Sequence, residues 1–116
     1  MSEYAGMQCE VCRVGAPTAT PDEIQRFLSD CPDWEVITVD EVPQIRRAYK
    51  FDDFASALEF TDKVGALAEK EGHHPALLTE WGRVTVRWWT HKIHGLHVND
   101  LIMGAKTDRI YGGHVR

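Results

Sequence analysis

The segment from residue 69 to residue 100 most constrains the fold. It reads as a helix end, a turn, a strand, a second turn and a helix start within 32 residues, so the chain folds back on itself. Three of its five histidines and two of its carboxylates are of particular interest because of where they fall near its turning points: His73, His74, His91, Glu69 and Asp100. An imidazole titrates near neutral pH, where general acid–base catalysis is most efficient. We therefore expect several proton-transfer groups to meet at one site.

Two signals place the first elements. Residues 20–23 read Thr-Pro-Asp-Glu and supply an N-cap, a proline at the first helical position and a capping-box glutamate. They predict a short helix that ends near Asp30. Alternating apolar residues predict a hairpin of two strands, Trp34 to Val39 and Ile45 to Phe51. Arg47 interrupts the apolar face of the second strand, so we expect it at the margin of the sheet.

The longest helix is predicted between Asp53, its N-cap, and Gly72, which suits the left-handed conformation just past a helix end. Apolar or small residues recur at three- and four-residue steps and predict its core-facing stripe: Phe54, Ala57, Leu58, Thr61, Val64, Gly65 and Ala68. Glu69 then lies in the last turn, beside the histidine pair.

Two more strands and a helix complete the prediction. Residues 76–80 are expected to form a short edge strand and residues 83–90 a longer one. Because alternate side chains of a strand share a face, Val84, Val86 and Trp88 should face the core and His91 should point away from it.

The final helix is predicted to begin near His97 or Val98 and to end near Gly112. Asp100 falls in its first turn, where the helix dipole favours a carboxylate. The order αββαββα predicts an α+β fold of two layers, with helices packed on one face of an antiparallel four-stranded sheet.

Length and composition limit the class of protein. The chain has 116 residues, of which 43% are hydrophobic and 27% charged, as expected of one globular domain. We predict a flexible N-terminal arm, residues 1–19, and a single domain, residues 20–116. A net charge of −5 disfavours nucleic-acid binding, and there is no 18-residue apolar run to span a membrane. Three cysteines without a secretion signal predict a cytoplasmic protein without a disulfide framework.

Each candidate site residue also has a structural interpretation. His73 can interact with the last carbonyls of the long helix, His74 can occupy a turn, and His91 can bond to a loop carbonyl. Glu69 is either a solvated residue or a group that orients an imidazole. Asp100 either stabilises the start of the last helix or contributes to the electrostatics of the site.

The aromatic residues and the proline near this segment leave further alternatives. Trp81 is either a wall of the site or a core anchor, and the core is favoured. Trp89, on the open face of the sheet, either covers a flat heterocycle or forms an oligomer contact. Pro75 fixes the chain direction because proline forces its predecessor into an extended conformation.

The residue types and their spacing resemble the pterin-4a-carbinolamine dehydratase family over roughly residues 34–112. The matching positions are Glu69, His73-His74-Pro75, Trp81, Thr90-His91, Gly95-Leu96 and Asp100. The resemblance implies a dehydratase that converts 4a-hydroxytetrahydropterin, the 4a-carbinolamine, to quinonoid dihydropterin. Such an enzyme recycles tetrahydrobiopterin after an aromatic amino-acid hydroxylase has used it.

The resemblance also implies the site and its partners. It gives His73, His74 and His91 as the catalytic set, with no metal and no organic cofactor, in a homodimer or homotetramer. We assign His73 and His91 as proton donors to the departing hydroxyl and His74 to the binding or orientation of the pterin ring. The residues assigned to substrate binding or orientation are Glu69, Pro75, Trp89 and Asp100.

Three positions depart from the usual family pattern. Gly72 replaces an acidic or amide residue, Leu77 an aromatic residue, and His97 the serine or threonine that caps the last helix, which predicts a weaker cap. Two rival functions remain. One is a non-catalytic dimerisation or assembly cofactor, as some relatives are; the other is a metalloenzyme using His91, His94 and His97. The Cys9–Cys12 pair is a separate candidate for zinc binding or redox chemistry, and a lone CxxC is weak evidence for either.

Overall fold

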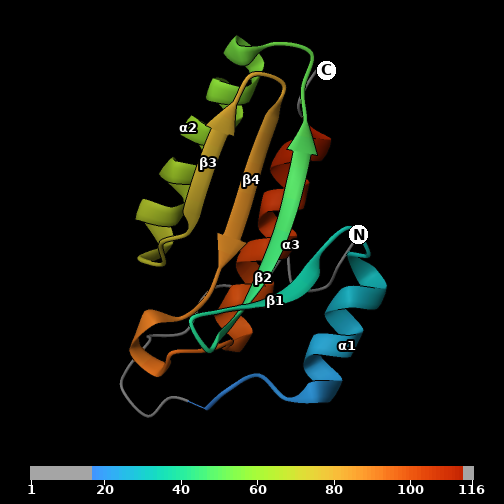
Figure 1. Ribbon diagram of the computed structural model, residues 1–116, viewed down its shortest axis with the longest axis vertical. Helices are drawn as coiled ribbons and strands as arrows, with labels where there is room; N and C mark the ends of the chain where they lie inside the picture. The colour runs from blue at the N-terminus through green and yellow to red at the C-terminus, as the bar shows by residue number, and fades with distance from the viewer. Residues whose placement is uncertain (1–16, 114–116) are drawn as a thin grey trace.

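The four strands form one antiparallel sheet in the order β1-β2-β4-β3, and the helices pack on a single face of it (Figure 1). This computed structural model describes residues 17–113. The elements are α1 Pro21–Asp30, β1 Glu35–Val39, β2 Val42–Lys50, α2 Phe54–Glu71, β3 Ala76–Glu80, β4 Arg83–Trp88, the 3-10 turn η2 His91–Ile93 and α3 Val98–Gly112. The predicted α+β fold is confirmed.

Strand register sends the apolar side chains of the two central strands to the helical layer. Ile45 lies opposite Trp88, and Tyr49 lies opposite Val84. All four side chains are buried. Helix α2 contacts β3 and β4, whereas α3 contacts β2 and β4, so the core lies between these two helices and the sheet.

The helix ends are set by local sequence, as predicted. Thr20 and Glu23 form a capping box at the start of α1. Asp53 caps α2 by accepting a hydrogen bond from the Ser56 amide at 2.7 Å. Gly72 ends α2 with φ +66°, a left-handed conformation that costs a glycine little. The chain therefore leaves α2 immediately before the histidine pair.

Four expectations about side chains differ from the structure. Phe54 and Leu58, predicted to be core, are each 44% exposed on α2. Trp81, favoured as a core anchor, is 74% exposed, because it lies in the tight β3–β4 turn beside Gly82. Arg47 lies on a central strand and not at the margin of the sheet, since its charge is paired with carboxylates.

The boundaries of the domain and of β4 also show differences of detail. Ala19, the last residue of the predicted arm, is buried, and its amide donates to the Leu96 carbonyl at 2.8 Å. Cys9 and Cys12 lie outside the described residues. Strand β4 ends at Trp88, two residues early, because Thr90 instead bridges to Gly95 and closes a loop. Of the helices formed by the described residues, none is long and apolar enough to cross a membrane.

Gly104 marks a close approach of α3 to side chains of α1 and β2. A Cβ atom at this position would lie 2.8 Å from Phe27 Cζ and 2.9 Å from Ile45 Cδ1, and both of these side chains are fully buried. Gly65 on α2 is different, because a Cβ there would meet no atom within 4 Å. The two helical glycines thus form a matched pair for testing the packing.

We expect Gly104→Ala to destabilise the fold and Gly65→Ala to stabilise it. Overpacking a tight core typically costs about 1–3 kcal/mol, whereas replacing an unconstrained helical glycine by alanine gains roughly 0.5–1 kcal/mol. Urea unfolding followed by circular dichroism measures both changes. Equal effects of the two substitutions would contradict the close approach at Gly104.

Candidate active site

The Asp100 carboxylate joins three segments at one end of the molecule. It belongs to the first turn of α3 and is fully buried. Its Oδ2 accepts hydrogen bonds from the Thr90 hydroxyl at 2.8 Å and from the His97 amide at 2.9 Å. Its Oδ1 lies 2.6 Å from His73 Nε2. The end of α2, the η2 loop and the start of α3 are therefore held together, as their positions in Figure 1 show.

His73 is a buried ring in this arrangement. Its side chain is only 6% exposed and stacks on Trp88, with ring centroids 5.8 Å apart and planes 8° apart. Its amide donates to the Ala68 carbonyl at 3.1 Å, which continues the C-terminal cap of α2. A carboxylate that accepts two donors on one oxygen can accept a third on the other. This assigns the shared proton to His73 Nε2.

His74 forms a second imidazole–carboxylate pair, at the surface. His74 Nε2 lies 2.6 Å from Glu69 Oε1, one turn back on α2. The His74 side chain is 59% exposed and that of Glu69 80%. Pro75 follows and leads directly into β3. The predicted placement of Glu69 beside the histidine pair is therefore observed, and its partner is His74.

His91 is exposed, in agreement with the expectation that it points away from the core, but it opens the η2 turn beyond the end of β4, so strand parity does not set its direction. Its ring packs against Trp89, with centroids 4.6 Å apart and planes at 33°. The Arg87 guanidinium lies over Trp89 at 5.5 Å and donates to Gln44 Oε1 at 2.9 Å. Trp89 thus contacts a site histidine, and Thr90, between these two residues, ties them to Asp100.

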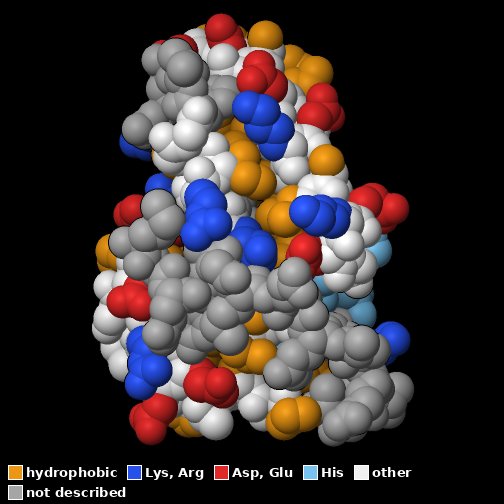
Figure 2. Space-filling view, turned by 180° about the vertical axis from the view of Figure 1, so that it is seen from behind, with side chains coloured by type: hydrophobic (Ala, Val, Ile, Leu, Met, Phe, Trp, Pro, Cys, Tyr) orange, Lys and Arg blue, Asp and Glu red, His pale blue; other side chains and the backbone are white. Residues whose placement is uncertain are grey.

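The histidines that were candidates for a metal site are not brought together. Histidine side chains gather along one edge of the molecule in Figure 2. However, His91, His94 and His97 form no metal site: within residues 17–113, no group of three or more His, Cys, Asp or Glu residues is arranged to hold a metal ion. His97 is buried, whereas His91 and His94 are exposed. Trp81 lies in the exposed β3–β4 turn, so of its two predicted roles the core anchor is excluded.

The expected weak cap at His97 was wrong. His97 Nδ1 accepts a hydrogen bond from the Asn99 amide at 3.0 Å, and its own amide donates to Asp100, so the two residues form a complete capping box. Sequence reasoning missed this role because the usual capping residues carry an oxygen acceptor. The position of His97, three residues before Asp100, was the available signal.

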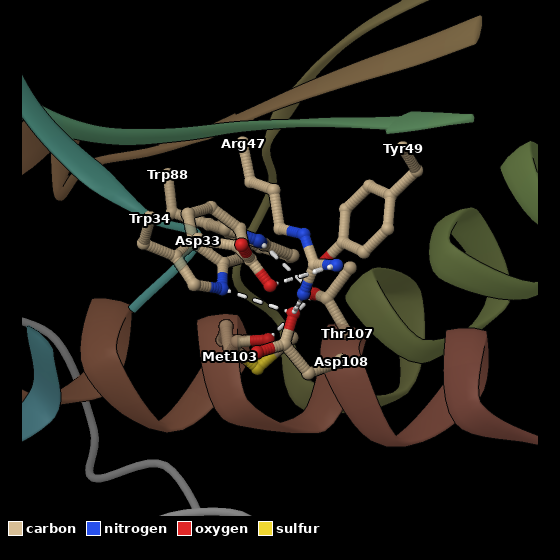
Figure 3. Close-up of polar contacts among 8 residues, drawn as sticks. All are labelled: Asp33, Trp34, Arg47, Tyr49, Trp88, Met103, Thr107 and Asp108. Atoms are coloured by element: carbon tan, nitrogen blue, oxygen red, sulfur yellow. Dashed lines mark hydrogen bonds and ion pairs between the residues drawn. The ribbon is translucent and has the colours of Figure 1, made fainter. Parts of the chain in front are cut away.

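A second polar cluster, which was not predicted, surrounds Asp108 on α3 (Figure 3). Asp108 Oδ1 accepts hydrogen bonds from Trp34 Nε1 at 3.0 Å, from an Arg47 guanidinium nitrogen at 2.7 Å and from the Tyr49 hydroxyl at 2.5 Å. Arg47 also pairs with Asp33 at 3.4 Å. The cluster ties α3 to β2 and to the residues before β1, so its role is to hold the layers together.

Burial raises the pKa of Tyr49 well above its ordinary value, and the charge of Asp108 and the hydrogen bond to it raise this pKa further. Each effect disfavours the phenolate, because an anion would lose its solvation and face another anion.

The structure is that of a small α+β protein with two imidazole–carboxylate pairs formed by the histidines that follow α2. The family model described as Pterin 4 alpha carbinolamine dehydratase matches residues 17–110, and the chain belongs to this family. Two curated relatives carry the name "Putative pterin-4-alpha-carbinolamine dehydratase". The one from Syntrophotalea carbinolica is 61% identical and that from Nitrosococcus oceani 57%, each covering 95% of this chain and 98% or 97% of the relative.

Solved structures share the architecture. A transcriptional coactivator/pterin dehydratase from Brucella melitensis is 32% identical with a TM-score of 0.72, covering 81% of this chain and 98% of that one. A pterin dehydratase-like protein identified as a RuBisCO assembly factor in the alpha-carboxysome is 21% identical with a TM-score of 0.59, covering 69% of this chain and 90% of that one. The second likeness concerns the fold alone.

The two carboxylates of the site should differ sharply in their contribution to stability. Asp100→Asn replaces one acceptor oxygen with an amide donor that faces the partners of Asp100, and disrupting a buried pair costs about 3–5 kcal/mol. Glu69→Gln changes an exposed pair worth less than about 1 kcal/mol. Chemical denaturation measures both. A small loss for Asp100→Asn would contradict its place as the buried link between segments.

Tyr49 predicts an alkaline loss of stability. The unfolded phenol ionises near pH 10, whereas the folded one resists ionisation. The free energy of unfolding should therefore be unaffected below about pH 10 and fall as the pH rises toward the raised pKa of the folded state. Tyr49→Phe should flatten this fall, and Tyr111→Phe, whose hydroxyl donates to the Lys50 carbonyl instead, should leave it in place. Parallel alkaline curves for wild type and Tyr49→Phe would contradict the assignment.

Proposed function

We propose that this protein dehydrates 4a-hydroxytetrahydropterin to quinonoid dihydropterin by histidine general acid–base catalysis. Membership of the family supports the substrate class. The observation that carries the proposal is the shared Asp100 carboxylate, which holds His73 and the Thr90–His91 segment at one place. The His74–Glu69 pair lies immediately beside it in the chain.

The reaction needs a proton donor and a proton acceptor. The C4a–O bond of the carbinolamine breaks while a donor protonates the departing oxygen, so that water leaves. A ring N–H then gives its proton to a base, and its electron pair completes the new double bond. The proton given and the proton taken balance, so imidazoles can carry the whole cycle.

The surroundings of the three histidines suit different roles. His91 is exposed and braced by Trp89, so we assign it as the proton donor that reaches the departing hydroxyl. His74, exposed and paired with Glu69, binds or orients the pterin ring together with Pro75. His73 is held against Asp100 and stacked on Trp88, and we assign this fixed ring as a second donor.

The setting of the reaction is also part of the proposal. We place the enzyme in the cytoplasm, coupled to an aromatic amino-acid hydroxylase that produces the carbinolamine, with no metal or organic cofactor. We expect a homodimer or homotetramer. Phe54 and Leu58, one turn apart on α2 and each 44% exposed, support this expectation because exposed apolar stripes on helices favour association.

An assembly or coactivator role is the second candidate. It is favoured by one of the structures with the same fold, which is described as a RuBisCO assembly factor, and by the coactivator description of the Brucella protein. A non-catalytic scaffold needs the buried His73–Asp100 pair for its fold, but it has no need of the exposed His74–Glu69 pair or of the exposed His91. Dehydratase kinetics therefore separate the two candidates.

Substitution of the site histidines should lower dehydration without unfolding the protein. A general acid contributes typically 10²- to 10⁴-fold in rate, so His91→Ala should lower kcat by about that factor. His73→Gln, which keeps a donor toward Asp100 but cannot exchange a proton, should do the same. His74→Ala should act mainly on KM, because we assign that ring to holding the pterin. Steady-state kinetics with enzymatically generated carbinolamine measure these effects.

The control is His94→Asn, since His94 is exposed and asparagine tolerates its φ of +49°. It should be nearly silent, with circular dichroism to confirm folding in all four variants. Wild-type rates for both His91→Ala and His73→Gln would reject the catalytic assignment and favour the assembly role. Loss of activity on chelation, restored by zinc, would instead favour the metalloenzyme.

A further inference from the structure

We infer that His97 is a positioning residue of the proposed active site: as a neutral imidazole it caps α3 and so fixes the Asp100 carboxylate against His73. Its kinetic consequence rests on the proposed dehydratase function. The usual N-cap residues carry an oxygen acceptor, and here a ring nitrogen takes that place. His97 is 2% exposed, and Asn99 and Asp100 beside it are fully buried.

The direction of one hydrogen bond determines which ring nitrogen of His97 carries the proton. His97 Nδ1 lies 3.0 Å from the Asn99 amide nitrogen. A backbone N–H can only donate, so Nδ1 must offer a lone pair and carry no proton. His97 is therefore assigned as the neutral tautomer with its proton on Nε2. A second proton on the ring would convert the acceptor to a donor and break the cap.

The cap and the site share one carboxylate. The amide of His97 donates to Asp100 Oδ2, and the amide of Asp100 donates to the His97 carbonyl at 2.9 Å. These bonds turn the Asp100 side chain back over the start of α3. Its other oxygen, Oδ1, is then directed to His73 Nε2 at 2.6 Å. A shift of the first turn of α3 would move this oxygen, so His97 acts on His73 through Asp100.

A ring nitrogen and a hydroxyl differ as caps of α3 in whether they can also donate a hydrogen bond to Asp100. A serine or threonine hydroxyl can donate as well as accept, and so can compete with His73 for the carboxylate. An unprotonated imidazole nitrogen cannot donate. With His97 as the cap, the side chains that bond to Asp100 are those of Thr90, on Oδ2, and His73, on Oδ1.

Substitutions at His97 distinguish a role in capping α3 from a role in packing alone. His97→Ala removes the acceptor. His97→Asn restores an acceptor, because asparagine is a preferred N-cap, and this acceptor cannot take up a proton. We expect His97→Ala to lower kcat about 10- to 100-fold with KM nearly unchanged, because small misplacements of a catalytic group have effects of this size. His97→Asn should return kcat to within about threefold of wild type. His94→Asn is the matched control and should resemble wild type.

Ring ¹⁵N spectra of the uniformly labelled protein supply a test that needs no activity. Wild type should show an unprotonated Nδ1 and a protonated Nε2 for His97. The His73 ring signals should move in His97→Ala and stay in place in His97→Asn. A protonated Nδ1 in wild type would overturn the inference, as would His97→Asn behaving like His97→Ala in kcat and in the His73 signals. Should wild type prove inactive, the dehydratase proposal fails, and the spectra still decide whether His97 positions His73.

Discussion

The buried Asp100 carboxylate is the constraint on which the arrangement of this end of the molecule depends. A charge without exposure to water is tolerated only if its oxygens are fully hydrogen-bonded, since uncompensated burial costs several kcal/mol. Here the donors come from the β4–η2 link, from the start of α3 and from the residue just past α2. No one of these segments can move without leaving the carboxylate short of a partner. The same hydrogen bonds to Asp100 therefore determine both the loop geometry and the position of His73.

The regular elements could be predicted because their signals are local. Thr20 and Glu23 specify the start of α1, and Asp53 and Gly72 specify both ends of α2, by contacts within a few residues. Errors arose where a side chain responds to partners distant in sequence. Arg47 was expected at the sheet margin because a charge rarely faces a core. Its partners Asp33 and Asp108 lie 14 and 61 positions away in the chain, and the periodicity of the sequence does not predict such distant ion pairs.

For the candidate site, the sequence indicated which residues to consider but not how they are connected. Residue type and spacing indicated both carboxylates and all three histidines. The pairing of Glu69 with His74, and of Asp100 with His73, depends on how tightly the chain turns after Gly72. The alternatives left open for Asp100, helix capping or contact with the site, are not exclusive, because one oxygen caps while the other faces His73. His97 was misread for a related reason: an imidazole caps a helix only when its unprotonated nitrogen faces an amide donor, and this contact depends on how the chain enters α3.

The two imidazole–carboxylate pairs have the same 2.6 Å separation and different physical meanings. Water surrounds the His74–Glu69 pair, so its Coulomb energy is largely screened and either partner can reorient when a ligand arrives. The His73–Asp100 pair is enclosed, and reorienting either ring or carboxylate would leave buried donors unsatisfied. A rigid pair is suited to keep a catalytic group aligned through a reaction, whereas an adjustable pair is suited to receive a substrate. This difference in burial, which distance alone does not reveal, is the physical basis for assigning His73 to proton transfer and His74 to the pterin ring.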